Sequence, residues 1–160
     1  MAEARVAVAG TEPQVQPGAH VLGAVDADEP IEVSVLVRPR ASLESIDQRL
    51  ARGDPPLSRE QFAAQYGADA SDLRAVASFA KRHGLAVVQS DAARRTVVLR
   101  GSAANVNDAF GVQLQHFSSS GGASFRAHEG PVYIPSALDG VVQAVLGLDT
   151  RPAAQSRRNR

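Results

Sequence analysis

Apolar residues occupy every second position from residue 31 to residue 37. This row is made of β-branched side chains: Ile31, Val33, Val35 and Val37. Glu32 and Ser34 fall between them and point to the opposite side of an extended chain, the pattern of a strand with one buried face. We therefore predict that ordered structure begins with this strand, which ends near Pro39.

The preceding segment, residues 1–30, carries scattered glycine and proline and no sustained hydrophobic period. Segments of this kind at a chain end are typically mobile. We expect a flexible N-terminal extension over residues 1–30, and deletion of residues 1–25 should cost little stability.

Helical spacing dominates the next part of the chain. A short helix is predicted by the apolar residues Leu43, Ile46 and Leu50, before Pro55 and Pro56. A second helix is predicted to begin at Ser58 and to end at Gly67. Ser58 and Gln61 have the spacing of a capping box, in which each side chain accepts a hydrogen bond from the other residue's backbone.

The most regular helical stripe lies between Asp69 and Gly84. Its inward positions are Leu73, Val76, Ala77 and Ala80, widened by Phe79. Two β-branched runs follow, "LAVVQS" and "RTVVLRG", and the polar "DAAR" between them predicts a hairpin. Residues 103–110 return to helical spacing and end at Gly111, after which "VQLQHF" predicts a strand with Val112 and Leu114 inward.

The predicted order is strand, helix, strand, strand, helix, strand. It corresponds to an α+β fold of the ferredoxin-like βαββαβ type, an antiparallel sheet with helices on one face. A C-terminal extended and helical segment follows, since Leu138, Val141, Val142 and Val145 have helical offsets despite Gly140. Phe79, Phe110 and Val35 should share the core.

The face of the sheet that the helices leave uncovered is predicted to carry an apolar strip. Its members occupy alternating strand positions: Leu36, Val88 and Val98. An exposed apolar strip on a sheet is typical of a surface that binds a partner.

The balance of basic and acidic residues argues against two classes of partner. The 160 residues include 17 basic and 17 acidic ones, so no global field attracts phosphate or an anionic membrane, and a nucleic-acid or membrane partner is not expected. There is no cysteine, which excludes disulfides and thiolate metal sites. No basic-then-apolar signal layout is visible at the N-terminus.

The search for catalytic chemistry in the sequence is negative. None of the four histidines, His20, His83, His116 and His128, has a second histidine at the four-residue spacing of a helical metal site. The carboxylate pairs Glu44–Asp47 and Asp69–Asp72 fit solvated helix faces and caps better than acid–base catalysis. No phosphate-binding glycine loop and no nucleophile elbow occurs. We therefore expect a binding protein, not an enzyme, with no cofactor and no metal.

Three stretches together carry a family resemblance. They are "LSREQFAAQYGADASDLRAVASFAKRHGLAV", "VVLRGSAANVNDAFGVQLQHF" and "FRAHEGPVYIPSALDGVVQAVLGLDTRP". In this order and at these separations they resemble the activation propeptide of the sedolisin family, the kumamolisin-like serine-carboxyl peptidases. The resemblance covers residues 31–152. It implies a ferredoxin-like prodomain that assists folding of a peptidase catalytic domain, in cis in the family, and keeps it inactive until acid triggers cleavage of a linker.

The resemblance also implies a division of the chain: a prodomain over residues 31–148 and a basic linker over residues 149–160. The cleavage and linker residues would be Arg151, Pro152, Ala153, Ala154, Arg157 and Arg158. Candidate pH-sensing groups are His116, His128 and Glu129, which flank a glycine-rich turn or follow it. If the chain follows the family, it is extracellular. The family's catalytic serine motif and its glutamate and aspartate partners are absent from these residues, which suggests an isolated prodomain, a standalone inhibitor acting in trans, or a truncated remnant.

Two other interpretations remain open on the residues alone. A ferredoxin-like regulatory module that binds a small effector would also lack catalytic groups. An RNA-binding protein would use the arginines of the basic tail on phosphates, but Tyr66 and Tyr133 do not form an aromatic surface for stacking bases.

Overall fold

The structure is a computed structural model that describes residues 4–12 and 18–150. It has a mixed α+β fold, as predicted. The helices are α1 (Glu44–Ala51), α2 (Arg59–Tyr66), α3 (Ala70–Arg82) and α4 (Ala103–Phe110), with one 3-10 turn, η1 (Ser136–Leu138). The strands are β1 (Arg5–Ala7), β2 (His20–Ala24), β3 (Pro30–Val37), β4 (Ala86–Asp91), β5 (Thr96–Ser102), β6 (Gln115–Ser118), β7 (Ser124–Ala127), β8 (Tyr133–Pro135) and β9 (Val142–Leu146).

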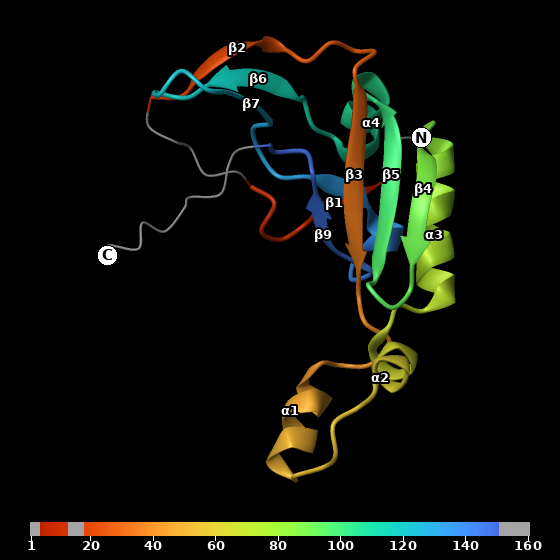
Figure 1. Cartoon of the computed structure of the whole chain (residues 1–160). Helices are drawn as coiled ribbons and strands as arrows, with labels where there is room; N and C mark the ends of the chain where they lie inside the picture. The colour runs from red at the N-terminus through yellow and green to blue at the C-terminus, as the bar shows by residue number, and fades with distance from the viewer. Residues whose placement is uncertain (1–3, 13–17, 151–160) are drawn as a thin grey trace, which may run out of the picture.

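The largest sheet has four strands in the order β4-β5-β3-β9, and every neighbouring pair is antiparallel. Figure 1 shows β3, β5 and β4 side by side, with α3 running behind β4. Val35 pairs with Val97 of β5 on one side and with Val145 of β9 on the other. All three side chains are buried, so this row lies on the core face of the sheet.

Helices α3 and α4 pack on that core face. Phe79 of α3 and Phe110 of α4 meet edge to face with ring centroids 5.5 Å apart, and both are fully buried together with Val35. The predicted shared core is therefore confirmed. Aromatic rings in this arrangement contribute more than their buried area alone.

Local capping signals fix where the helices begin and end. Ser58 and Gln61 form the predicted capping box, with bonds of 3.0 and 3.1 Å to each other's backbone or side chain. Gly111 ends α4 in the left-handed region with φ of 61°, a conformation that costs glycine no side-chain clash.

The N-terminal part of the chain differs from its sequence-based interpretation. The prediction that order begins at residue 31 is wrong, since β1 pairs with β8 and β2 pairs with β6. Val8 and Val25 are buried in the core. The partners of these strands lie more than 90 residues away, and a local hydrophobic period carries no information on such long-range pairing.

Two further elements are corrected. The last strand of the four-stranded sheet is β9, in a stretch that was predicted to be helical, and residues 112–117 do not supply that strand. Val112 and Leu114 are buried as predicted, but they precede β6, which belongs to a separate three-stranded sheet of order β2-β6-β7. Figure 1 shows this smaller sheet curling over one end of the larger one.

Helices α1 and α2 project from the opposite end of the large sheet (Figure 1). Helix α1 buries none of its residues. A hydrogen bond of 2.6 Å between the Ser45 and Tyr66 hydroxyls joins it to α2. No helix in the described part of the chain is long and apolar enough to cross a bilayer.

Candidate functional site

The outer face of the four-stranded sheet is a candidate binding surface. On β3 the core-facing residues alternate with Ser34 and Leu36, which are half-buried on the outer face. Ser34 pairs with Leu146 of β9 and with Val98 of β5, so these three side chains form one row across three strands. No helix of the described chain packs on this row, because α3 and α4 belong to the core on the other face.

Apolar side chains are exposed at both ends of this row. Leu146 on the edge strand β9 is 58% exposed. On β4, Gln89 pairs with Val98, and the neighbouring Val88, at the register shift, is 56% exposed. With the half-buried Leu36 and Val98 they make an apolar band, which we call the outer band. Three of its members are those that the sequence predicted; Leu146 was missed because its segment was assigned to a helix.

The candidate pH-sensing residues lie in different surroundings. His128 follows β7 and is buried, and its ring Nδ1 lies 3.0 Å from the Gly130 carbonyl oxygen, to which an Nδ1–H group donates. His116 on β6 is partly exposed, with Nε2 4.0 Å from Oε2 of Glu29. That Glu29 oxygen is buried and has no hydrogen-bond partner among the described residues. Glu129 is exposed.

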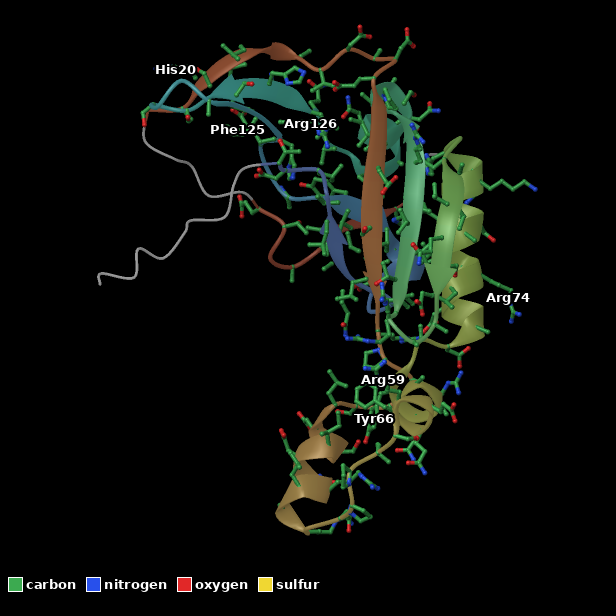
Figure 2. The ribbon with its side chains drawn as sticks, viewed as in Figure 1. His20, Arg59, Tyr66, Arg74, Phe125 and Arg126 are labelled. Atoms are coloured by element: carbon green, nitrogen blue, oxygen red, sulfur yellow. The ribbon has the colours of Figure 1, made fainter. Side chains whose placement is uncertain are left out.

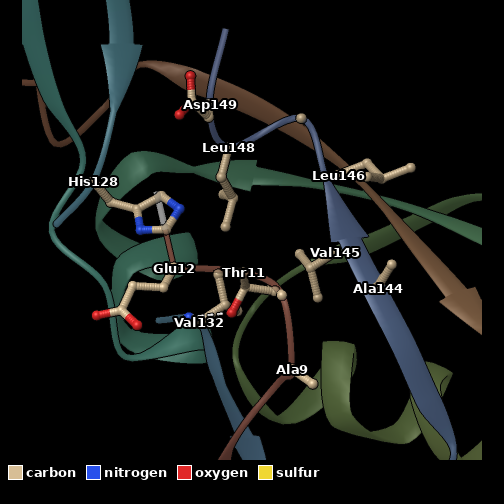
Figure 3. A pocket seen from close by; sticks show the side chains of 12 residues that line it. Ala9, Thr11, Glu12, His128, Val132, Ala144, Val145, Leu146, Leu148 and Asp149 are labelled. Atoms are coloured by element: carbon tan, nitrogen blue, oxygen red, sulfur yellow. Dashed lines mark hydrogen bonds between the residues drawn. The ribbon is translucent and has the colours of Figure 1, made fainter. Parts of the chain in front are cut away.

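His128 also faces a pocket of about 260 Å³ (Figure 3). One wall is formed by residues 9–12, which follow β1, and the other by residues 144–149 at the end of β9. Glu12 and Asp149 supply the carboxylates of the lining. Within residues 4–12 and 18–150, no three histidine or carboxylate side chains gather as ligands for a metal ion.

Arg126 of β7 binds the last described residues of the chain, 147–150. Sequence reasoning missed this residue. Its Nη2 donates to the Gly147 carbonyl over 2.9 Å, and its Nε donates to the Leu148 carbonyl over 3.4 Å. The Arg126 backbone exchanges bonds with Thr150. No local signal in the run "SFRAH" indicates these contacts, because their partners lie more than 20 residues downstream.

A second missed pair lies where α3 meets the end of β3. Arg38 donates two hydrogen bonds to the Asp72 carboxylate, at 2.8 and 3.1 Å, and this contact raises the pKa of Arg38. Asp72 is buried, so the solvated helix face that the sequence predicted for it is corrected.

Asp69 caps α3 as predicted. The backbone N–H and the hydroxyl of Ser71 donate to its carboxylate and lower its pKa. The contacts of Asp69 and Asp72 hold the first turn of α3 in place, and they involve no residue of the outer band.

The predicted cleavage and linker residues, Arg151, Pro152, Ala153, Ala154, Arg157 and Arg158, lie outside the described residues. What the structure does describe is the position from which they continue. That position is Thr150, held beside β7.

Comparison with known proteins gives a consistent result. The family model "Pro-kumamolisin, activation domain" matches residues 17–151. Kumamolisin of Bacillus sp. (strain MN-32) is 38% identical over 159 residues, which cover 96% of this chain and 29% of that protein. Tripeptidyl-peptidase sed5 of Aspergillus fumigatus is 26% identical over 155 residues, covering 84% of this chain and 27% of the relative.

A third relative, xanthomonalisin of Xanthomonas sp. (strain T-22), is 27% identical over 133 residues, covering 78% of this chain and 16% of the relative. The chain thus spans less than a third of the length of each of these proteins. The matching region is an activation domain and not a catalytic domain. On the extent of these matches, the chain belongs to the pro-kumamolisin activation domain family of the sedolisin peptidases.

Proposed function

We propose that this chain binds the catalytic domain of a sedolisin-type serine-carboxyl peptidase, inhibits it and assists its folding, and has no catalytic role of its own. The observation that carries the proposal is the outer band, an apolar surface that no helix or strand of the described residues covers, on a domain of the activation family. Kumamolisin and tripeptidyl-peptidase sed5 are more than three times longer than the matching region, and the second is a peptidase by name, which supports a catalytic domain in cis in these relatives. For this chain, the proposal also includes binding to a catalytic domain on a separate polypeptide, in trans.

We also propose a ferredoxin-like topology for the central unit. The strand order β4-β5-β3-β9, with α3 and α4 on one face, supports it if β9 is taken as the last strand of the βαββαβ series. The proposed folded unit then extends back to β1 and forward to Leu148, and residues 149–160 form the linker.

The outer band is the proposed docking surface. A standard protein interface buries roughly 1,600 Å² in total and has an apolar centre with a polar rim. Glu32 and Arg100 pair across β3 and β5 beside the band and supply polar groups at its margin. A surface of this kind reaches nanomolar affinity when it is well packed.

The first test is titration calorimetry of the chain with a purified sedolisin catalytic domain at neutral pH, followed by an inhibition assay. We expect nanomolar binding and inhibition by the unmodified chain. Leu146→Asp places a charge in the band at an exposed position and should weaken binding by about tenfold or more, equivalent to ~1.4 kcal/mol.

Ser78→Asp is the matched control, since it adds the same charge on the exposed side of α3. It should leave affinity unchanged. Absence of both heat and inhibition with the unmodified chain would refute the proposed function. Equal losses with both variants would refute the outer band as the docking surface.

The linker proposal predicts a pH-dependent cleavage pattern. Residues 151–158 follow Thr150 in the sequence. Pro152 disfavours a helical conformation at Arg151, and the small side chains of Ala153 and Ala154 leave a protease access to the backbone. Histidine and glutamate side chains gain protons between about pH 6.5 and pH 4. We propose that His116, His128 and Glu129 belong to a surface that binds the partner better at neutral pH than in acid, so that acid weakens the complex and accelerates cleavage.

The experiment is incubation with an active sedolisin at pH 7 and at pH 4, with cuts mapped by mass spectrometry. We expect cuts within residues 149–160 that become faster in acid than cuts in a synthetic peptide of the same residues, which reports the peptidase's own pH dependence. Earlier cuts in the folded core, or a pH response equal to that of the peptide, would contradict the linker mechanism.

A further inference from the structure

The last described residues of the chain are held at the free edge of a sheet. In the three-stranded sheet of order β2-β6-β7, the one strand that pairs with β7 among residues 4–12 and 18–150 is β6. On the other side of β7, Thr150 occupies the edge. The Thr150 amide donates to the Arg126 carbonyl over 2.8 Å, and the Arg126 amide donates to the Thr150 hydroxyl over 2.7 Å.

The side chain of Arg126 extends this contact backward along the chain. Its guanidinium donates through two different nitrogens to the carbonyls of Gly147 and Leu148, which directly follow β9. A planar guanidinium is suited to such a fork because its donors are fixed in direction. Figure 2 marks Arg126 on β7, between the smaller sheet and the large one. The residue therefore links the three-stranded sheet to the end of the four-stranded sheet.

Residues 147–150 are also held by their one apolar side chain, Leu148. Leu148 is 1% exposed and lines the pocket together with His128 and Val132 (Figure 3). The buried side chain fixes one point of the segment, whereas the Arg126 fork and the Thr150 bonds fix its direction on either side of that point. We call residues 147–150 and Arg126 the exit clamp.

We infer that Arg126 is a positioning residue that fixes the course of residues 147–150 after the end of β9, and so sets the point from which the proposed linker continues. Release of the clamp would free four further residues, each of which spans at most about 3.3–3.6 Å. The first residue after the clamp would then be free to move by up to ~13–14 Å from its clamped position. This freedom lowers the effective concentration of the tethered segment at a fixed binding cleft.

This inference rests on the proposed function in one respect only, the use as a linker of residues 149–160, of which the clamp holds the first two. The course of residues 147–150 is a property of the chain alone. It can be measured without any sedolisin, so a failure of the clamp and a failure of the proposed function are distinguishable.

The test uses an endoproteinase that cuts on the N-terminal side of aspartate, with the full chain as substrate. The bond between Leu148 and Asp149 lies inside the exit clamp and reports its opening. In Arg126→Ala the fork is lost, and we expect this bond to be cut about tenfold faster than in the unmodified chain, because cleavage follows the population of the locally opened state. Arg126→Lys should give an intermediate rate, since an ammonium group cannot reproduce the fork.

Arg74→Ala is the matched control, because Arg74 extends from α3 on the far side of the large sheet from β9 (Figure 2). Its cleavage rate before Asp149 should equal that of the unmodified chain. Thr150→Ala provides a second, independent variant at an exposed position, and it should also accelerate the cut by removing the hydroxyl that accepts from the Arg126 amide.

Melting curves and the cuts before other aspartates report global unfolding in the same samples. Faster cleavage before Asp149 at an unchanged melting temperature supports the inference. An unchanged rate in both Arg126→Ala and Thr150→Ala overturns it, as does an increase that occurs equally at all aspartates.

Discussion

Replacement of Phe110 by alanine is expected to lower the free energy of unfolding by about 3–5 kcal/mol. Phe110 is fully buried at the end of α4, where its ring meets Phe79 of α3 edge to face. Alanine would leave a cavity between both helices and the sheet, and the close-packed surroundings relax only partly into such a space. A loss of this size is a large part of the 5–15 kcal/mol typical of a domain.

Urea denaturation followed by circular dichroism measures this loss. Phe62→Ala is the matched control, since the Phe62 ring is 40% exposed on α2, and it should change the free energy of unfolding by no more than about 1 kcal/mol. A smaller loss for Phe110→Ala than for Phe62→Ala would show that the assignment of the core is wrong.

Deletion of residues 1–25 is expected to remove most of the stability, contrary to what the sequence alone predicts. The deletion takes away β1 and β2 together with Val8 and Val25, which are both buried. Full burial of one valine contributes roughly 1.5–3 kcal/mol. Val132 and Ile134 are buried in the core beside β1, and the deletion removes β1 from them.

The measurement is the denaturation midpoint of the truncated chain beside that of the full chain. A pair of point variants separates packing from chain length: Val25→Ala should destabilise clearly, whereas Leu22→Ala, at an exposed position of β2, should not. A truncated chain as stable as the full one would show that the N-terminal strands contribute nothing to the fold.

Local signals were enough to predict the helices. Ser58 with Gln61 marks the start of α2, and the stripe that includes Val76 and Phe79 marks α3. These signals act within four residues, through capping bonds and the 3.6-residue period. The hairpin β4–β5 was predicted for the same reason, because its two strands adjoin in sequence.

The outer band was predicted in part. Leu36, Val88 and Val98 follow from the alternation along three strands, which identifies the face opposite the core. Leu146 required knowledge of β9, and Arg126 required knowledge that residues 147–150 return to β7. Contacts of this kind join segments that are distant in sequence, and no local period reports them.

Strand β9 shows why a pattern can mislead. Val142 and Val145 lie three residues apart and both face the core, which is the spacing of a helix. Their partners on β3, Val37 and Val35, are only two residues apart, and the register shift between them identifies a β-bulge. A bulge inserts one extra residue into a strand and thereby changes the spacing of its inward side chains.

The sequence by itself determined the helices and their caps, the hairpin and the central strand β3, because each depends on residues close together in the chain. It also determined the family resemblance, which rests on the order and separation of three stretches and needs no contact between them. Only the tertiary structure decided the places of β1, β2 and β9 and the contacts of the exit clamp. Each of these depends on backbone hydrogen bonds to a partner strand or a distant side chain. Such bonds form with whichever edge the folded core presents, and that edge exists only after the core has assembled.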